Sequence, residues 1–235
     1  MSDSSKTPNA GPGAGPDTPS IALADRVTRI APSPTVAISS LALDLRAAGR
    51  DVIGLAVGEP DFETPPHVKE AAIRAIHDGH TRYTQVDGIP ELKEAVAEKF
   101  RRENGLDVSA ANISVGTGGK QVLFNALMAT VQAGDEVIIP APYWVSFAGI
   151  TEVAGGTPVF LASGFADGLK LSPERLEAAI TPRSRWVIIN SPSNPTGMGY
   201  SADELRAFAD VIRRHPNVMV ISDDLYEHLT YDGFE

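Results

Sequence analysis

A glycine-rich segment, Gly116-Thr117-Gly118-Gly119-Lys120, lies between an apolar run and a helical pattern. Glycines at such a turn leave main-chain N–H groups open, and the dipole at the start of a helix favours an anion there. A phosphate group would suit this position. The spacing matches neither the Walker motif nor GxGxxG. Taken alone, the segment is equally consistent with a plain tight turn.

Two further segments carry groups that could contact a flat ligand. Trp144, in Pro142-Tyr143-Trp144, follows an apolar run and could stack on a ring, although a core or interface tryptophan is the alternative. Asn194 lies between two prolines in Ser191-Pro192-Ser193-Asn194-Pro195-Thr196-Gly197. The prolines stiffen this loop, and its amide can both donate and accept. The alternative is an Asn-Pro turn without a ligand.

An acid stands at the end of another apolar run, in Ser222-Asp223-Asp224-Leu225-Tyr226. A carboxylate at the end of a buried strand is costly unless it meets a cation or hydrogen-bond donors. The protonated ring nitrogen of a cofactor would be such a cation. A helix-capping or salt-bridged aspartate is the alternative interpretation of Asp223.

The elements that must position these residues follow from periodicity. Thr35 is expected to cap a first helix, Pro90 and Ser172-Pro173 to start two others, and Ser201 with Glu204 to form a capping box. Apolar spacing predicts helices near residues 35–45, 68–76, 90–100, 120–131, 173 onward and 202–212. Apolar runs predict strands at 113–115, 136–139, 158–161, 186–190 and 218–222.

Strands that are apolar along their length and separated by helices indicate a mostly parallel sheet covered on both faces, so the fold class is predicted to be α/β, a three-layer sandwich. Ligands of such sheets bind at the carboxyl ends of the strands. The segments singled out above each follow a predicted strand. We therefore expect Gly116–Lys120, Pro140–Trp144, Asn190–Gly197 and Asp223–Tyr226 to converge on one site.

Composition excludes several kinds of function. The net charge of −10 argues against nucleic acid as a partner, because phosphate backbones attract basic surfaces. The chain has no cysteine, which excludes disulfides and thiolate chemistry, and His77 and His80 indicate a helix end rather than a zinc site. No apolar run approaches the ~20 residues that a bilayer requires, and no signal peptide is evident, so we predict a cytoplasmic protein without membrane or metal.

Together the segments resemble class I, fold-type I aminotransferases of the aspartate aminotransferase family, which depend on pyridoxal 5'-phosphate. The resemblance runs from about residue 25 to about residue 233 and is closest to the subgroup acting on aspartate and related amino acids. Its segments, in order, are APSPTVAIS, VGEPDFETP, TRYTQVDGIPELKEAVAEKF, GTGGKQVLFNAL, PYWVSF, NSPSNPTG and SDDLYEHLTYDG.

The resemblance implies a role for each matched residue. Gly118, Gly119 and Lys120 match the cup that holds the cofactor phosphate, and Trp144 matches the aromatic that stacks on the pyridine ring. Asp223 matches the carboxylate paired with the pyridine nitrogen. An acid at this nitrogen makes the ring a better electron sink for removal of the substrate α-proton.

Other matched positions contact the phenolic oxygen, the substrate or the partner subunit. Asn194 and Tyr226 match the side chains that bond the phenolic oxygen, and Gly58, with Trp144 and Asn194, matches contacts to the substrate. Tyr83 matches a tyrosine that reaches the cofactor phosphate of the partner, which implies a homodimer. The family's proline loops often contain cis bonds, so Asn194-Pro195 and then Ala141-Pro142 are the candidates.

The resemblance also implies parts that lie beyond residue 235. Family chains continue there with the lysine that forms the imine with the cofactor and an arginine that clamps the substrate carboxylate. None of Lys6, Lys69, Lys93, Lys99, Lys120 and Lys170 is a credible substitute; Lys170 is expected to lie away from the strand ends. We expect the chain alone to be inactive. We also expect a disordered tail at 1–24, part of a small domain at 25–62, and a truncated cofactor-binding domain at 63–235.

Three hypotheses remain open from the sequence. The first is an aminotransferase, present here as an N-terminal portion, that exchanges the amino group of an amino acid with a 2-oxo acid. The second is a non-catalytic binding module with the same fold. The third is a lyase or synthase that uses the same cofactor. The family usually has Asp-Glu-Ile-Tyr where this chain has Asp223-Asp224-Leu225-Tyr226, but the acid and the tyrosine are kept.

Overall fold

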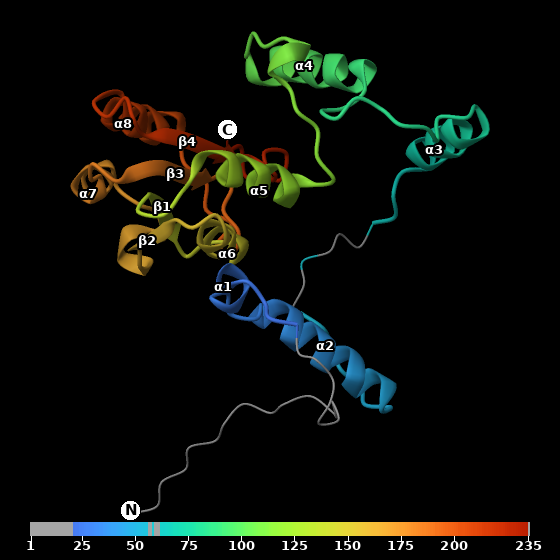
Figure 1. Ribbon diagram of the computed structural model, residues 1–235, viewed down its shortest axis with the longest axis horizontal. Coiled ribbons are helices and arrows are strands. Elements are labelled where there is room, and N and C mark those ends of the chain that lie inside the picture. The colour runs from blue at the N-terminus through green and yellow to red at the C-terminus, as the bar shows by residue number, and fades with distance from the viewer. Residues whose placement is uncertain (1–20, 56–57, 59–61, 235) are drawn as a thin grey trace, which may run out of the picture.

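The computed structural model describes residues 21–55, 58 and 62–234, and its centre is a four-stranded parallel sheet (Figure 1). The strands are β1 (Glu136–Ala141), β2 (Thr157–Ala162), β3 (Ser184–Asn190) and β4 (Met219–Asp223), in the spatial order β2-β1-β3-β4. All three strand pairs are parallel. The predicted α/β class with a parallel sheet is therefore confirmed.

Alternate residues of the central strands belong to two separate apolar clusters, one on each face of the sheet. Ile138 of β1 joins Leu176 of α7 (Pro173–Ala179) and Phe208 of α8 (Ala202–Arg213). Val137 and Ile139 point the other way because successive side chains of a strand face opposite sides.

The second cluster lies under two other helices. Leu127 belongs to α5 (Gly119–Thr130), and Phe147 and Ile150 belong to α6 (Ser146–Val153). Both faces of the sheet are thus covered, which is the three-layer arrangement expected from continuously apolar strands. Helix α6 had not been predicted, because its eight residues are too short a window for a clear helical period.

Two of the three predicted side-chain caps are confirmed. The Ser172 hydroxyl accepts from the N–H of Arg175, and Ser201 and Glu204 form a reciprocal capping box at α8. The prediction of Thr35 as a cap was wrong. Ser33 caps α2 (Pro34–Ala47) instead, because Pro34 occupies the first helical position and moves the cap one residue before itself.

Four helices precede α5 among the described residues. They are α1 (Asp25–Thr28), α2, α3 (Pro66–His77) and α4 (Pro90–Asn104), and two 3₁₀ turns, η1 (Ala110–Asn112) and η2 (Phe165–Asp167), occur further on. Helices α1 to α3 bury no residue, and Figure 1 shows α2 and α3 standing apart from the sheet. No helix among the described residues has the length and apolarity needed to cross a bilayer.

The predicted strand at 113–115 was wrong. These residues are irregular, and the main-chain N–H of Val115 bonds to the carbonyl of Asp87 rather than to a neighbouring strand. A short apolar run forms a strand only where a partner is in place, and the described part of the chain offers none there. Residues 1–20 of the predicted tail at 1–24 lie outside the described residues. The predicted boundary between a small domain at 25–62 and a cofactor-binding domain at 63–235 stays a prediction.

Candidate functional site

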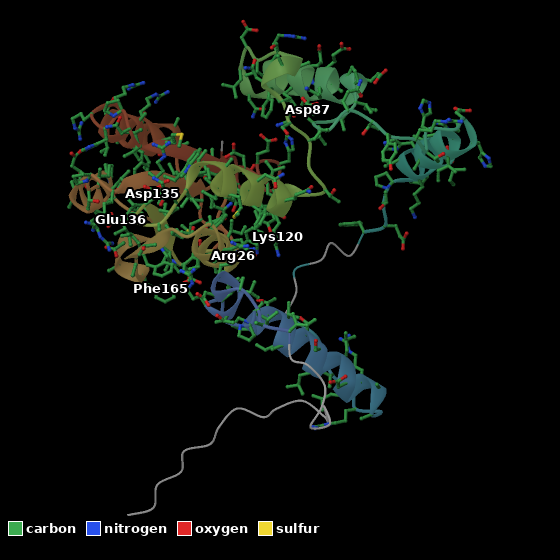
Figure 2. The ribbon with its side chains drawn as sticks, viewed as in Figure 1. Arg26, Asp87, Lys120, Asp135, Glu136 and Phe165 are labelled. Carbon is green, nitrogen blue, oxygen red and sulfur yellow. The ribbon has the colours of Figure 1, made fainter. Side chains whose placement is uncertain are left out.

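Three of the four chemically interesting segments meet where β1, β3 and β4 end. Asn190 is the last residue of β3, Asp223 is the last residue of β4, and the two are paired in register. Trp144 follows the end of β1, the strand on the other side of β3. The expected convergence at the carboxyl edge is confirmed for these segments. Figure 2 shows Glu136, at the amino end of β1, far from Lys120.

The side chain of Asn190 connects two parts of this edge, and sequence reasoning had not assigned it a role. Its Nδ2 donates to the carbonyl of Asp223 at 2.8 Å, and its Oδ1 accepts from the main-chain N–H of Asn194 at 2.7 Å. One half-buried amide therefore holds the Asn194 loop against the end of β4. The signal in the sequence was a lone polar residue ending an apolar strand, whose amide can satisfy a donor and an acceptor together.

Replacing Asn190 by alanine is expected to destabilise the chain by about 1–2 kcal/mol, because the N–H of Asn194 loses its partner and the carbonyl of Asp223 keeps only the N–H of Ser191, at 3.3 Å. Asn125→Ala is the matched control, since Asn125 is exposed on α5 and alanine favours a helix. Urea unfolding of the two variants measures the difference. Equal stability of both would show that the Asn190 bridge contributes nothing.

The glycine segment forms an open turn at the start of α5. Gly118 adopts a φ of +90° and is the N-terminal cap position of the helix, which has no side-chain cap. A Cβ atom at Gly118 or at Gly119 would meet nothing within 4 Å. The N–H groups of Gly119 and Lys120 have no acceptor among the described residues, whereas the N–H of Gln121 bonds to the carbonyl of Gly118. Those first two groups can therefore donate to an anion that enters this space.

The core interpretation of Trp144 is confirmed, and its stacking on a ligand ring stays a prediction. Its indole packs on the second apolar cluster, edge to face with Phe147 at 5.4 Å and 88° between the rings. It is only partly buried, and the Nζ of Lys120 lies 5.1 Å from the centre of its ring. A core contact thus fixes the indole while part of it stays accessible beside Lys120, at the start of α5.

Asp223 has a pKa raised above its ordinary value, because burial removes water from the charged form and the charge of Asp224 adds to the effect. One hydrogen bond opposes this, from the N–H of Leu225 to its Oδ1 at 3.4 Å. No cation among the described residues pairs with it. The carboxyl group is therefore in a position where a cationic ligand would be stabilising, and the salt-bridged alternative is excluded within the described chain.

Asn194 and Tyr226 lie near this acid. Their side chains are half-buried, and neither forms a hydrogen bond with the residues that the structure describes. Asn194 is held through its main chain by Asn190, and Tyr226 is held by a turn in which its carbonyl accepts from Leu229. An amide and a hydroxyl are thus available to a ligand at the same edge.

Gly58 and Tyr83 are not brought to this edge. Tyr83 is fully exposed in the connection between α3 and α4, which Figure 1 shows apart from the sheet. Gly58 is a single described residue between segments outside the description, with open space around it. Their expected contacts to a partner subunit and to a substrate stay predictions.

Most described lysines are engaged elsewhere. Lys69 pairs with Glu63, Lys93 with Asp87 and Lys99 with Glu227. The expectation that Lys170 lies away from the strand ends was wrong, because it lines a cavity together with Ala141 and Asn190, the last residues of β1 and β3.

The cavity position does not leave Lys170 free. Its ammonium pairs with Glu204 at 2.6 Å and lies 5.8 Å from the ring centre of Tyr200. The ion pair with Glu204 therefore commits the Lys170 side chain to a structural contact rather than to attack on a carbonyl group.

Both predicted cis bonds are confirmed, at Asn194-Pro195 and at Ala141-Pro142. A third, Ser191-Pro192, had not been predicted. The loop that carries Asn194 therefore contains two cis bonds, and its N–H groups of Gly197 and Ser193 are bonded across it to the carbonyls of Ser193 and Met198. The loop is ordered by its own main chain.

Comparison with known proteins gives a consistent result. The chain is 60% identical over 213 residues to the aspartate/prephenate aminotransferase of Cereibacter sphaeroides, a match that covers 91% of this chain and 53% of that protein. A crystal structure of the aspartate aminotransferase from Rhizobium meliloti superposes with a TM-score of 0.88 at 52% identity, covering 92% of this chain and 54% of that one.

A second solved structure, the aspartate aminotransferase of Thermus thermophilus with maleate, gives a TM-score of 0.88 at 48% identity, covering 92% and 56%. The chain spans about half the length of the curated relatives it matches. A family model described as aminotransferase class I and II matches residues 50–235, most of the chain. The resemblance seen in the loops therefore extends to sequence and backbone alike, and the chain belongs to the class I and II aminotransferases.

Proposed function

We propose that this chain forms the cofactor-binding portion of a pyridoxal-phosphate-dependent aminotransferase. The observation that carries the proposal is the half-buried Asp223 carboxyl group, which has no cation among the described residues and lies at a sheet edge shared with Trp144 and Asn194. A protonated pyridine nitrogen would supply the missing cation. The membership of the chain in the aminotransferase family supports the same cofactor.

The donor set at the edge fits the cofactor part by part. Unpartnered N–H groups at the start of α5, with open space at Gly118 and Gly119, suit its phosphate. The partly buried Trp144 indole suits its ring, and the free side chains of Asn194 and Tyr226 suit its phenolic oxygen. Each group differs in chemistry, and each matches a different part of one molecule.

Pyridoxal phosphate, when bound, supplies a conjugated ring that withdraws electrons from the α-carbon of an amino acid. The Asp223 carboxylate would hold a proton on the ring nitrogen, which strengthens that withdrawal. The Asn194 amide and the Tyr226 hydroxyl would donate to the phenolic oxygen. Trp144 would restrain the plane of the ring, so that the bond to the α-proton can stand perpendicular to that plane and overlap with the π system.

The substrates we propose are an aspartate-like amino acid and a 2-oxo acid. The relatives named aspartate and aspartate/prephenate aminotransferase support this class. A homodimer, with Tyr83 reaching the partner's cofactor, and a cytoplasmic location stay predictions. The imine-forming lysine is proposed to lie outside residues 1–235, since Lys170 is paired with Glu204 and Lys120 lies at the phosphate end of the site.

Titration of the chain with pyridoxal phosphate is expected to quench Trp144 fluorescence reversibly. A Trp186→Phe background leaves Trp144 as the only tryptophan. Borohydride added at saturation should leave no reduced cofactor on any single internal lysine, which peptide mass spectrometry would check. Absence of quenching would contradict the proposed site, and a specific lysine adduct would contradict the proposed inactivity of the isolated chain.

A further inference from the structure

Glu227 directly follows Tyr226 and is bound on both carboxylate oxygens by helix α4. The Nζ of Lys99 donates to its Oε1, and the Nδ2 of Asn104 donates to its Oε2 at 2.8 Å. Lys99 and Asn104 are also bonded to each other, Nζ to Oδ1, at 2.9 Å. The three side chains form a closed triangle between two segments more than 120 residues apart in the chain.

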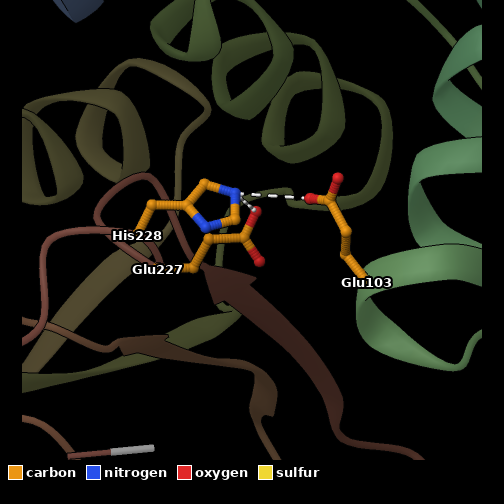
Figure 3. A group of neighbouring side chains, drawn as sticks. All are labelled: Glu103, Glu227 and His228. Carbon is orange, nitrogen blue, oxygen red and sulfur yellow. Dashed lines mark ion pairs between the residues drawn. The ribbon is translucent and has the colours of Figure 1, made fainter. Parts of the chain in front are cut away.

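His228 and Glu103 also lie at this contact, but the three groups Glu103, Glu227 and His228 do not form a metal site. The Nε2 of His228 lies 3.3 Å from an oxygen of Glu103 and 3.4 Å from one of Glu227 (Figure 3). Three ligand-type groups therefore gather there. The ammonium of Lys99, however, already pairs with both glutamates, at 3.7 Å in the case of Glu103, so a cation of the protein occupies the position.

The contact lies where it can hold the cofactor-facing turn. After β4 the main chain turns with two bonds, from the N–H of Glu227 to the carbonyl of Asp224 at 3.0 Å and from Leu229 to Tyr226 at 2.8 Å. Asp223 lies directly before this turn, and Tyr226 lies within it. Lys99 and Glu227 are 29% and 25% exposed, so their attraction is less screened than that of a surface pair. The hydrogen bond from Lys99 also lowers the pKa of Glu227, which keeps it charged.

We propose that Lys99 and Asn104 of α4 are positioning residues that, through Glu227, fix the turn carrying Asp223 and Tyr226 against the cofactor ring. This inference rests on the proposed function, since it assigns the turn a ligand to meet. Lys99 acts through Glu227 and does not itself touch the ligand. Helix α4 thereby contributes to the site although none of its residues reaches the strand ends.

The test uses Lys99→Met, which removes the ammonium while keeping length and helix propensity. Lys93→Met is the matched control, because Lys93 lies on the same helix and pairs with Asp87, away from the turn. Amide hydrogen exchange of Glu227 and Leu229 should be about tenfold faster in Lys99→Met than in Lys93→Met, the order expected for loss of a charge-assisted hydrogen bond. Affinity for pyridoxal phosphate, read from Trp144 fluorescence, should fall by a similar factor.

Glu227→Gln provides a second variant, which keeps the shape and one acceptor oxygen but loses the charge and the second acceptor. It should also speed exchange at the turn and weaken the binding of pyridoxal phosphate relative to Lys93→Met. Exchange at the turn equal to that in Lys93→Met would overturn the positioning role. Faster exchange with unchanged affinity would overturn it too, since the contact would then be structural only. If the unsubstituted chain fails to bind pyridoxal phosphate, the proposed function fails, and with it the ligand half of this inference, while exchange still decides whether α4 holds the turn.

Discussion

Asp223→Asn is expected to weaken the binding of pyridoxal phosphate by about 10- to 150-fold. The carboxyl group is half-buried at the end of β4 and has no cation within the described chain, so a ring nitrogen would be its only ionic partner. A hydrogen bond to a charged group contributes about 1.5–3 kcal/mol, which corresponds to that range. Asparagine keeps the shape and can still accept from Leu225, so the loss isolates the charge.

The same substitution should stabilise the cofactor-free chain at neutral pH, by less than about 1 kcal/mol because the group is only partly buried. The pKa of Asp223 is higher in the folded chain than in the unfolded chain, so the folded state binds the proton more tightly. The stability of the unsubstituted chain therefore falls as pH rises from the unfolded value of 3.8 through the raised folded value. The gain from Asp223→Asn should be absent near pH 3 and complete at pH 7 in urea titrations.

Asp224→Asn is the matched control for the affinity measurement; it does not serve for the stability measurement, because the charge of Asp224 contributes to the raised pKa of Asp223. Asp224 is the next residue, is exposed, and accepts from the hydroxyl of Ser222 at 2.7 Å. No ligand contact is proposed for Asp224, so ligand affinity should change by less than about threefold. Equal affinities of Asp223→Asn and the unsubstituted chain, with Asp224→Asn also unchanged, would remove the basis for placing a ring nitrogen at Asp223.

The sheet and its covering helices could be predicted because their signals are local. Ile138 and Ile189 lie in runs apolar on both faces, and Ser201 with Glu204 marks a helix start within four residues. The segment 113–115 looked equally strand-like but has no neighbour to pair with. Strand formation depends on a partner distant in the chain, and a periodicity argument does not contain that information.

The residues at the candidate site could be predicted from the sequence, but the hydrogen bonds and ion pairs that hold them in place could not. Trp144 follows one apolar strand and Asp223 ends another, which is enough to place them at one edge. Asn190 bonds to residues 4 and 33 positions further along the chain, and Lys99 pairs with Glu227, 128 positions away. In the sequence these polar side chains cannot be told from solvated surface residues. Contacts of this kind become visible only when two elements are placed side by side.

Gly118→Ala is expected to destabilise the chain by about 1–3 kcal/mol and to weaken binding of inorganic phosphate and of pyridoxal phosphate at least tenfold. Gly118 has φ +90° and ψ 157°, a combination essentially restricted to glycine. A Cβ there would touch nothing within 4 Å, so the cost would come from the backbone alone and not from a clash. Relief of that strain would turn the first N–H groups of α5 away from the anion.

Gly119→Ala separates backbone strain from added bulk. Gly119 is the first residue of α5, also has open space at its Cβ, and is not among the residues with positive φ. Alanine suits a helix better than glycine, so this variant should be as stable as the unsubstituted chain or slightly more stable. Both substitutions add one methyl group at the same helix end, so a loss of phosphate binding shared equally by the two would mean that bulk matters. Equal stability of the two variants would mean that the turn at Gly118 does not need its left-handed backbone, and the cup would then owe its shape to the start of α5 alone.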